Sequence, residues 1–180
     1  GITVTQNTIN IDRVGASGGC YGTYETGTPS TVGHTITNNT ITFTNLAGTS
    51  TAFGIYSLGG LTAATNTKTI NTNTINMSGT NSGQSIGIII GYGNGTINNN
   101  SITINNASTD PNGIWANQTG AAAFTITGNT LSLTSNATAP TSMIGISGGA
   151  IGPFQIYSNT FSALNFTGII TTSPTVSGIS

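Results

Sequence analysis

Charged residues are nearly missing from this 180-residue chain, which has two Lys or Arg, three Asp or Glu, and a charged fraction of 3%. An average soluble domain carries roughly 25%. Because nucleic-acid binding needs Lys and Arg to neutralise phosphates, two basic residues argue against a nucleic-acid partner. No apolar run approaches the ~20 residues of a membrane-spanning helix, so we expect no membrane insertion.

Cysteine and proline are also scarce. A single cysteine, Cys20, excludes an internal disulfide framework, and we interpret it as a small buried residue rather than a reactive thiol. Disordered chains usually stay soluble through charge or proline, whereas this one has five prolines and a net charge of −1. Apolar residues recur at regular intervals, so the sequence predicts an ordered protein.

What the chain does contain is a repeat. The phrase around "TITNNTITFTN" returns six times, each with an Asn before Thr or Ser and then an apolar residue. The six anchors are Asn7, Asn39, Asn73, Asn100, Asn129 and Asn159. They recur every 27 to 34 residues, a period typical of solenoids.

Apolar residues within each unit alternate with Thr, Ser and Asn, which predicts β-strands with one face inward. Three residues before the anchors stand Val4, Ile36, Ile70, Ile97, Ile126 and Ile156. Two residues after them stand Ile9, Ile41, Ile75, Ile102, Leu131 and Phe161. Four residues after them stand Ile11, Phe43, Met77, Ile104, Leu133 and Ala163.

A glycine, usually followed by Ile, marks a third strand in each unit. The pairs begin at Gly22, Gly54, Gly87, Gly113, Gly145 and Gly178. Three short strands per unit of ~30 residues predict an all-β fold, a parallel β-helix of about six coils. The coils would stack at about 4.8 Å, the ordinary spacing between strands.

The anchor Asn is expected at a corner of each coil. There its amide can donate to one neighbouring coil and accept from the other, which would form an Asn ladder along the axis. Asn also tolerates the left-handed backbone conformation that a sharp corner can require.

Units of the form I-x-x-N-T-I followed by G-I resemble right-handed parallel β-helix repeats. More narrowly, they resemble the Thr/Asn/Gly-rich arrays of secreted surface proteins from Bacteroidetes-like bacteria. The resemblance covers nearly the whole chain and implies a right-handed helix and an extracellular or cell-surface location. It is loose for function, since β-helices serve as lyases, tailspikes, adhesins and fibres alike.

The two ends of the sequence read as continuations of each other, because "VSGIS" followed by "GITVTQNTI" matches the internal units. An isolated solenoid needs polar caps, and none is recognisable here. We therefore expect residues 1–180 to be one β-helix block, an internal segment of a longer solenoid or a subunit that stacks on copies of itself. The expected partners are those copies or adjoining repeats.

Titratable residues offer little for catalysis. They are Asp12, Arg13, Glu25, His34, Lys68 and Asp110, besides Cys20 and the tyrosines. Asp12 and Asp110 would lie about three coils apart, roughly 14 Å, which is too far for a hydrolytic pair. A weak surface ion pair is the simplest interpretation of Asp12, Arg13 and Glu25, with His34 nearby. No metal-ligand spacing is recognisable, so we expect no enzyme, no cofactor and no metal site.

The outward columns consist of Thr, Asn and Ser, and three aromatic residues follow the Gly-Ile signature: Tyr24, Tyr56 and Trp115. These rings are candidates for stacking on sugars, although shielding of a strand edge is the simpler interpretation. A Thr array could alternatively match ice, but Thr is about equally frequent on both sides. We also expect Thr and Asn columns to form hydrogen-bonded ladders between coils.

Seven acceptor sequons for N-glycosylation begin at Asn38, Asn94, Asn99, Asn106, Asn117, Asn136 and Asn165, and most are expected by chance in this composition. The sequence as a whole favours a structural component of an extracellular filament, stalk or surface adhesin. The alternatives are a carbohydrate- or ice-binding module and, third, a non-catalytic fragment of a polysaccharide-active β-helix enzyme.

Overall fold

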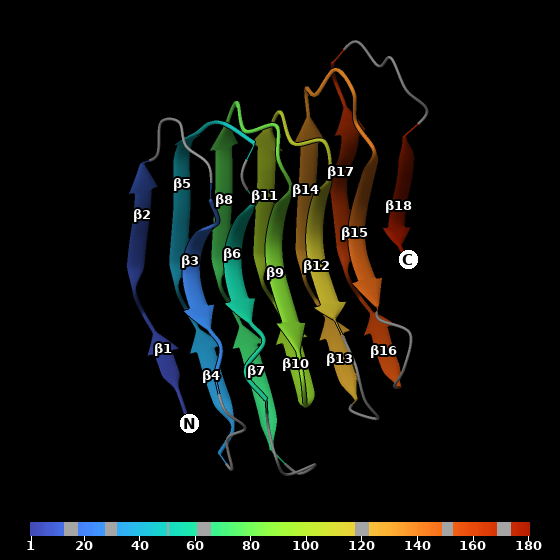
Figure 1. Ribbon diagram of the computed structural model, residues 1–180. Helices are drawn as coiled ribbons and strands as arrows, with labels where there is room; N and C mark the ends of the chain where they lie inside the picture. Colours follow the sequence, from blue (N-terminus) through green and yellow to red (C-terminus); the bar gives the residue numbers. More distant parts are fainter. Residues whose placement is uncertain are drawn as a thin grey trace.

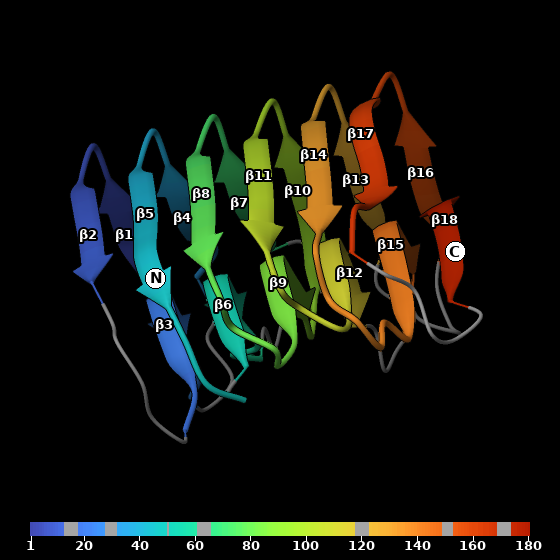
Figure 2. The ribbon, with the colours of Figure 1, turned by 90° about the horizontal axis from the view of Figure 1, so that it is seen from above.

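The computed structural model describes residues 1–12, 18–27, 32–49, 51–60, 66–117, 123–148, 153–168 and 174–180. Within these ranges the chain is all-β, with eighteen strands and no helix. The strands form three parallel sheets of six strands each, stacked as a β-solenoid (Figures 1 and 2). The predicted fold class is therefore confirmed, as is the count of three strands per coil.

Each coil contributes one strand to each sheet. The first sheet contains β1 (Thr3–Thr5), β4 (His34–Thr37), β7 (Thr67–Asn71), β10 (Asn94–Asn98), β13 (Phe124–Thr127) and β16 (Phe154–Tyr157). The second contains β2 (Thr8–Asp12), β5 (Thr40–Leu46), β8 (Thr74–Gly79), β11 (Ser101–Asn106), β14 (Thr130–Ser135) and β17 (Thr160–Phe166). The third contains β3 (Cys20–Glu25), β6 (Ala52–Ser57), β9 (Ser85–Gly91), β12 (Pro111–Asn117), β15 (Ser142–Gly148) and β18 (Thr175–Ile179).

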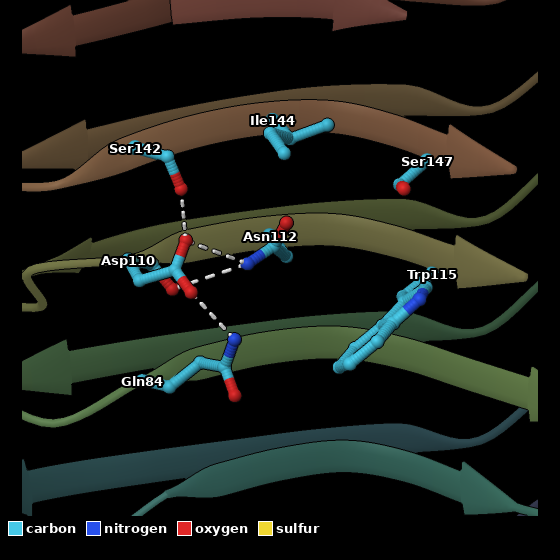
Figure 3. Close-up of a pocket in the computed structure, with 7 residues that line it drawn as sticks. All are labelled: Gln84, Asp110, Asn112, Trp115, Ser142, Ile144 and Ser147. Atoms are coloured by element: carbon cyan, nitrogen blue, oxygen red, sulfur yellow. Dashed lines mark hydrogen bonds between the residues drawn. The ribbon is translucent and has the colours of Figure 1, made fainter. Parts of the chain in front are cut away.

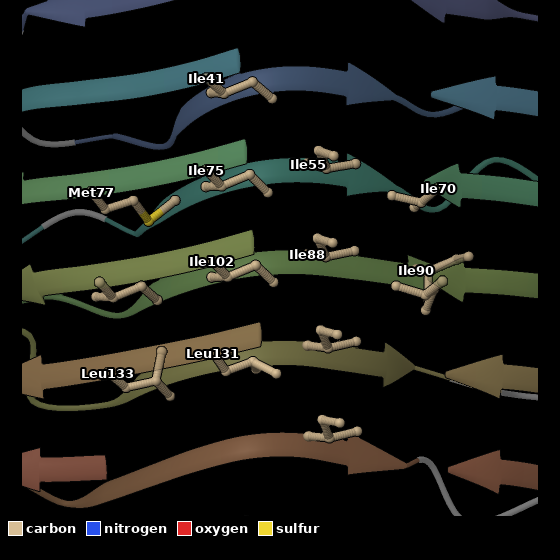
Figure 4. Close-up of a cluster of buried hydrophobic side chains, with 14 of the residues drawn as sticks. Ile41, Ile55, Ile70, Ile75, Met77, Ile88, Ile90, Ile102, Leu131 and Leu133 are labelled. Carbon is tan, nitrogen blue, oxygen red and sulfur yellow. The ribbon is translucent and has the colours of Figure 1, made fainter. Parts of the chain in front are cut away.

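The core is a column of apolar side chains that runs inside the solenoid along its axis. Ile41, Ile75, Ile102 and Leu131 form one row, and Ile55 and Ile88 belong to another (Figure 4). These side chains are no more than 1% exposed. β-branched Ile fits here because it favours the extended backbone and packs against its own kind in the coils on either side.

The register matches the apolar columns read from the sequence, with one exception. Ala163 was expected opposite Leu133, but Leu164 occupies that place and Ala163 lies opposite Ser132. The pairing of β14 with β17 shifts after Leu131, so β17 holds one extra residue, a β-bulge. The bulge turns a Leu rather than an Ala toward the core, and so more apolar surface is buried.

The glycine of the third strand is explained by the closeness of the neighbouring coil. A Cβ built on Gly87 would lie 2.6 Å from the carbonyl oxygen of Gly113 and 2.6 Å from Ile102 Cγ2. Real Cβ atoms do not approach other atoms so closely, so any larger residue would push the coils apart. Cys20 is buried in the same core, as predicted.

Candidate functional site

The six anchor Asn side chains form a continuous row of hydrogen bonds at the corner between the first and second sheets. From Asn7 to Asn129, each Nδ2 donates to the Oδ1 of the Asn in the next coil, at 2.9 to 3.0 Å. The backbone N–H of each Asn, from Asn7 to Asn129, donates to the same Oδ1. We call this row the Asn ladder. From Asn39 to Asn129 its members are at most 1% exposed.

From Asn39 to Asn159, each amide in the ladder also ties the corner to the previous coil. Asn73 Nδ2, for example, donates to the carbonyl oxygen of Ile36 at 2.9 Å and to that of its own Asn71 at 3.1 Å. Buried polar groups must find partners, and the short amide of Asn supplies both N–H donors and an oxygen acceptor. Stacked Asp would repel and could not donate.

The left-handed backbone at the corner belongs to a different residue from the expected one. Positive φ falls on the residue before each anchor: Gln6 at 58°, Asn38 at 56°, Thr72 at 54°, Asn99 at 54°, Gly128 at 66° and Ser158 at 54°. The chain turns at this residue, so that the anchor that follows can point its amide into the solenoid wall. Thr72 is β-branched, and a β-branched residue is strained in this region.

The outward Thr columns lie in register on the first and second sheets, but they are not ladders. Thr35 pairs with Thr69, and Thr40 pairs with Thr74. Among the described residues no hydrogen bond joins the outward Thr side chains of neighbouring coils. Strands lie about 4.8 Å apart, while hydroxyls bond at about 2.8 Å, so the short Thr side chain does not span the gap. Since both sheets carry such columns, neither face stands out as an ice-binding array.

The outer face of the third sheet is different because it carries aromatic rings. Tyr24 pairs with Tyr56, which pairs with Ile89, which pairs with Trp115. The three aromatic residues singled out in the sequence therefore stand in one outward column. Tyr24 is 59% exposed, and its ring lies 5.0 Å from that of Tyr56 at an interplanar angle of 21°.

A second outward column runs beside the first. Tyr21 pairs with Phe53, and their rings stack at 5.1 Å and 3°. Edge contacts join the two columns, with 4.7 Å between the ring centres of Tyr21 and Tyr24 and 5.0 Å between those of Phe53 and Tyr56. These four rings, which we call the aromatic platform, cover the first two coils of the third sheet. Sequence analysis found Tyr24 and Tyr56 but missed Tyr21 and Phe53.

Further along this face lies a small hollow of about 190 Å³ beside Trp115, lined also by Gln84, Asp110, Asn112, Ser142, Ile144 and Ser147 (Figure 3). The carboxylate of Asp110 accepts hydrogen bonds from three of these side chains. Asp110 Oδ2 accepts from Gln84 Nε2 at 2.6 Å, and Oδ1 accepts from Asn112 Nδ2 at 3.1 Å and from Ser142 Oγ. Sequence analysis missed this grouping, although aligning the third strands on their glycines would have placed Asn112 and Ile144 together.

Inside the solenoid lies an ionic cluster of Glu25, His34 and Lys68. Glu25 Oε2 accepts from Ser57 Oγ at 2.7 Å and from Lys68 Nζ at 3.3 Å, and Glu25 Oε1 lies 3.3 Å from His34 Nδ1. That last contact has the distance of an ion pair but not the geometry of a hydrogen bond. Lys68 Nζ also donates to the carbonyl oxygens of Ser57 at 3.1 Å and Gly91 at 2.8 Å.

The position of this cluster corrects the expected surface ion pair. Glu25 and His34 are each 5% exposed and Lys68 is 1% exposed. Burial would raise the pKa of Glu25, but the Ser57 hydrogen bond and the charges of Lys68 and His34 outweigh it, so the pKa lies below its ordinary value. Burial lowers the pKa of Lys68, while Glu25 opposes that shift. Sequence analysis missed Lys68 because an isolated Lys is usually exposed.

The remaining charged residues are not part of the ionic cluster. Asp12 is exposed and accepts from Asn45 Nδ2 at 2.8 Å. Arg13 lies outside the described residues. Asp12 ends β2 of the first coil and Asp110 precedes β12 of the fourth, in keeping with the expected separation of three coils. Within the described ranges, no three His, Cys, Asp or Glu side chains are grouped as metal ligands would be.

The sequons differ in accessibility. Asn38, Asn99, Asn136 and Asn165 are exposed, and Asn94 and Asn117 are half-buried. Asn106 is 2% exposed, and its side chain donates to Ser85 Oγ and accepts from the N–H of Ser108. An attached glycan would have to break these contacts. Asn106 is therefore a poor acceptor, while the exposed Asn residues remain candidates.

In comparisons with known proteins, no family model, no curated protein and no solved structure matches this chain. The described part of the chain contains no helix that is long and apolar enough to span a membrane.

Proposed function

We propose that this chain is a non-enzymatic structural segment of an extracellular filament, stalk or surface adhesin, whose coils stack end to end on further coils. The observation that carries the proposal is the direction of the Asn ladder. At one end Asn7 Oδ1 receives no hydrogen bond from any described residue. At the other, the backbone N–H of Asn159 has no acceptor among the described residues. The acceptor at one end and the donor at the other would therefore form a hydrogen bond when two such ends stack.

The edges of the three sheets support the same arrangement. β1, β2 and β3 form one edge and β16, β17 and β18 form the other, each paired on one side only among the described strands. Unpaired strand edges are templates for further strands. Because the two edges differ, contact between them is head-to-tail, which generates open filaments rather than closed pairs.

The apolar core is also incompletely covered at both edges. Val4, Ile9 and Ile11 at one edge are only partly buried, whereas the core residues of the inner coils are almost fully buried. Phe154, Ile156 and Phe161 are likewise only partly buried at the other edge. One more coil at each edge would bury these side chains at about 25 cal/mol per Å². The very low charge leaves such ends without mutual repulsion.

Two observations support a non-enzymatic role. Glu25 is enclosed in the lumen and bonded to Ser57 and Lys68, so it does not face a substrate. Asp12 and Asp110 lie three coils apart, about 14 Å at ordinary strand spacing, whereas a hydrolytic carboxylate pair spans roughly 5–9.5 Å. Stacked coils instead supply stiffness: parallel strands and the Asn ladder join every coil to the next.

Sedimentation of edge variants tests the proposal. Ile9→Lys places a charge in the core at the β2 edge, which should prevent a further coil from docking. Thr8→Lys adds the same charge on the neighbouring outward residue and should leave docking intact. We expect the unmodified chain and Thr8→Lys to form assemblies that grow with concentration, and Ile9→Lys to remain monomeric with an unchanged circular dichroism spectrum. Assembly of Ile9→Lys at the wild-type level would contradict the proposal.

A further inference from the structure

The aromatic platform and the hollow beside Trp115 lie on one outer face, and neither is needed to close the core. The other two sheets present mainly Thr, Ser and Asn to solvent, with Tyr157 as an exposed ring in β16, whereas this face presents several large rings. Tyr24 is 59% exposed and Tyr21 is 37% exposed. Exposed aromatic patches on soluble proteins commonly mark binding surfaces.

The platform spans neighbouring coils but is not flat, because its two columns meet edge to face at 67° to 87°. Tyr24 and Tyr56 stack at 21°, and Tyr21 and Phe53 stack at 3°, so each pair extends along the solenoid axis. Ring faces carry partial negative charge and attract partially positive C–H groups. A sugar ring has one face of such C–H groups, and its hydroxyls point outward around the edge. The stacked rings of the platform turn their faces toward each other, so they do not offer them to a sugar, whereas Trp115 lines the hollow.

The hollow places hydrogen-bonding side chains beside an aromatic ring. Asp110 holds Gln84 and Asn112 in fixed orientations through their N–H groups. Their carbonyl oxygens, Gln84 Oε1 and Asn112 Oδ1, accept no hydrogen bond from the described residues. Trp115 forms one wall, opposite the Asp110 group (Figure 3). A few placed polar groups beside an aromatic wall are typical of small-molecule sites.

The volume and the charge of the hollow limit the class of ligand that it can bind. Sites for drug-sized ligands occupy roughly 300–1,000 Å³, while this hollow of about 190 Å³ suits a single ring. The charge of the hollow comes from Asp110, and the one Lys of the described residues, Lys68, is enclosed in the lumen. Phosphate, sulfate or uronic acid groups would meet a carboxylate with no cation to offset it. An uncharged ligand with many hydroxyl donors fits best.

We infer that the hollow on the outer face of the third sheet binds a neutral glycan, with one sugar ring against Trp115. Ile89 lies between Trp115 and Tyr56 in this column but is only 4% exposed, so the proposed site is confined to the hollow. The inference is independent of end-to-end stacking, because this face lies along the side of the solenoid rather than at its ends.

Affinity electrophoresis tests the inference on the chain of residues 1–180. Native gels would contain hydroxyethyl cellulose, xylan or mannan as neutral probes, and polygalacturonate as an acidic one. We expect retardation in at least one neutral gel and none in polygalacturonate. Trp115→Ala should weaken the apparent affinity by about tenfold, which corresponds to about 1.4 kcal/mol, because it removes the ring that lines the hollow. Tyr157→Ala, which removes another exposed ring from the first sheet, should change nothing.

Asp110→Ala is the second variant, since it releases Gln84 and Asn112 but leaves every ring in place; it should also weaken retardation. The thermal unfolding of each variant, followed by circular dichroism, establishes that the fold is kept. Absence of retardation in all neutral gels would overturn the inference. So would equal retardation in polygalacturonate, or wild-type retardation of folded Trp115→Ala or Asp110→Ala. Self-association that Trp115→Ala abolishes without any glycan would assign this face to a second copy instead.

Discussion

Asn73 and Asn100 stand in neighbouring coils, and both the backbone N–H and the Nδ2 of Asn73 donate to Oδ1 of Asn100, at 2.9 and 3.0 Å. The same pair of bonds recurs at every step from Asn7 to Asn159. One oxygen therefore satisfies two donors of the previous coil. Loops of different length can separate the coils without disturbing this corner.

Removal of a central Asn from the Asn ladder should lower the free energy of unfolding substantially. Asn73→Ala leaves the N–H and Nδ2 of Asn39 without the oxygen that both donate to. Each buried bond contributes about 1 kcal/mol, and unsatisfied buried donors add to the loss, so we expect a decrease of roughly 3 kcal/mol in the free energy of unfolding. Asn7→Ala, at the exposed edge, should cost about 1 kcal/mol. Urea unfolding measures both, and equal losses would contradict the role of burial in the ladder.

The Glu25–Lys68 pair should make the free energy of unfolding depend on pH in the acidic range. Because the pKa of Glu25 is lowered in the fold, its contribution is complete above its ordinary pKa of about 4.5 and is lost as the pH falls through the lower folded value. Below that point a charged Lys68 is buried without its counter-ion. We expect the free energy of unfolding to drop below about pH 4.5. In Glu25→Gln that drop should be smaller, with about 3–5 kcal/mol already lost at pH 7.

A double variant separates charge from packing. Glu25→Gln with Lys68→Met leaves no buried charge in this pair and should recover most of the stability lost in Glu25→Gln, since apolar replacements of buried ion pairs are often neutral or stabilising. Asp12→Asn is the matched control, because Asp12 is exposed, and it should change stability by less than about 0.5 kcal/mol. If the double variant were no more stable than Glu25→Gln, the buried Lys68 charge would not be the cause.

Thr72 offers a stabilising substitution. It holds φ at 54°, where a β-branched residue is strained, whereas Asn38 and Asn99 hold the equivalent corners of other coils. Thr72→Asn should therefore raise the free energy of unfolding by about 0.5–1 kcal/mol. Thr74→Asn, two residues later in the regular strand β8, should not stabilise. Thermal unfolding of the two variants side by side decides whether the corner backbone is responsible.

Gly87 should tolerate no side chain. Ala at this position would bring Cβ within 2.6 Å of both a neighbouring carbonyl oxygen and Ile102. Overpacked cores lose about 1–3 kcal/mol, and we expect Gly87→Ala to lose at least the upper part of this range. Gly148→Ala is a matched control on the same sheet, because its nearest non-adjacent atoms lie 3.5 Å away. Similar losses for the two variants would show that space is not the limiting factor at Gly87.

The fold could be predicted because it depends on local alternation repeated many times. Ile36, Ile70 and Ile97 occupy matching positions around their anchors, and a shift of one residue in the register would turn them outward. The predicted register failed only at Ala163, where apolar Ala163 and Leu164 stand side by side and the alternation alone does not decide which of them points inward.

The sites were harder to predict because they bring together residues from different positions in different units. Lys68 lies in β7 and reaches Glu25 in β3, 43 residues earlier, although neither belongs to a repeated column of charge. Gln84 and Asp110 precede their strands, in loops whose length varies from unit to unit. By contrast, Tyr24, Tyr56 and Trp115 could be singled out because each follows the repeated glycine at a fixed distance.

The central claim, that the coils stack end to end into a filament, is tested most directly by negative-stain electron microscopy of the purified chain in dilute buffer. The account predicts rods of uniform width and varied length, many times longer than the roughly 29 Å that six coils span at ordinary strand spacing. Discrete particles of a single compact size at every concentration would contradict it.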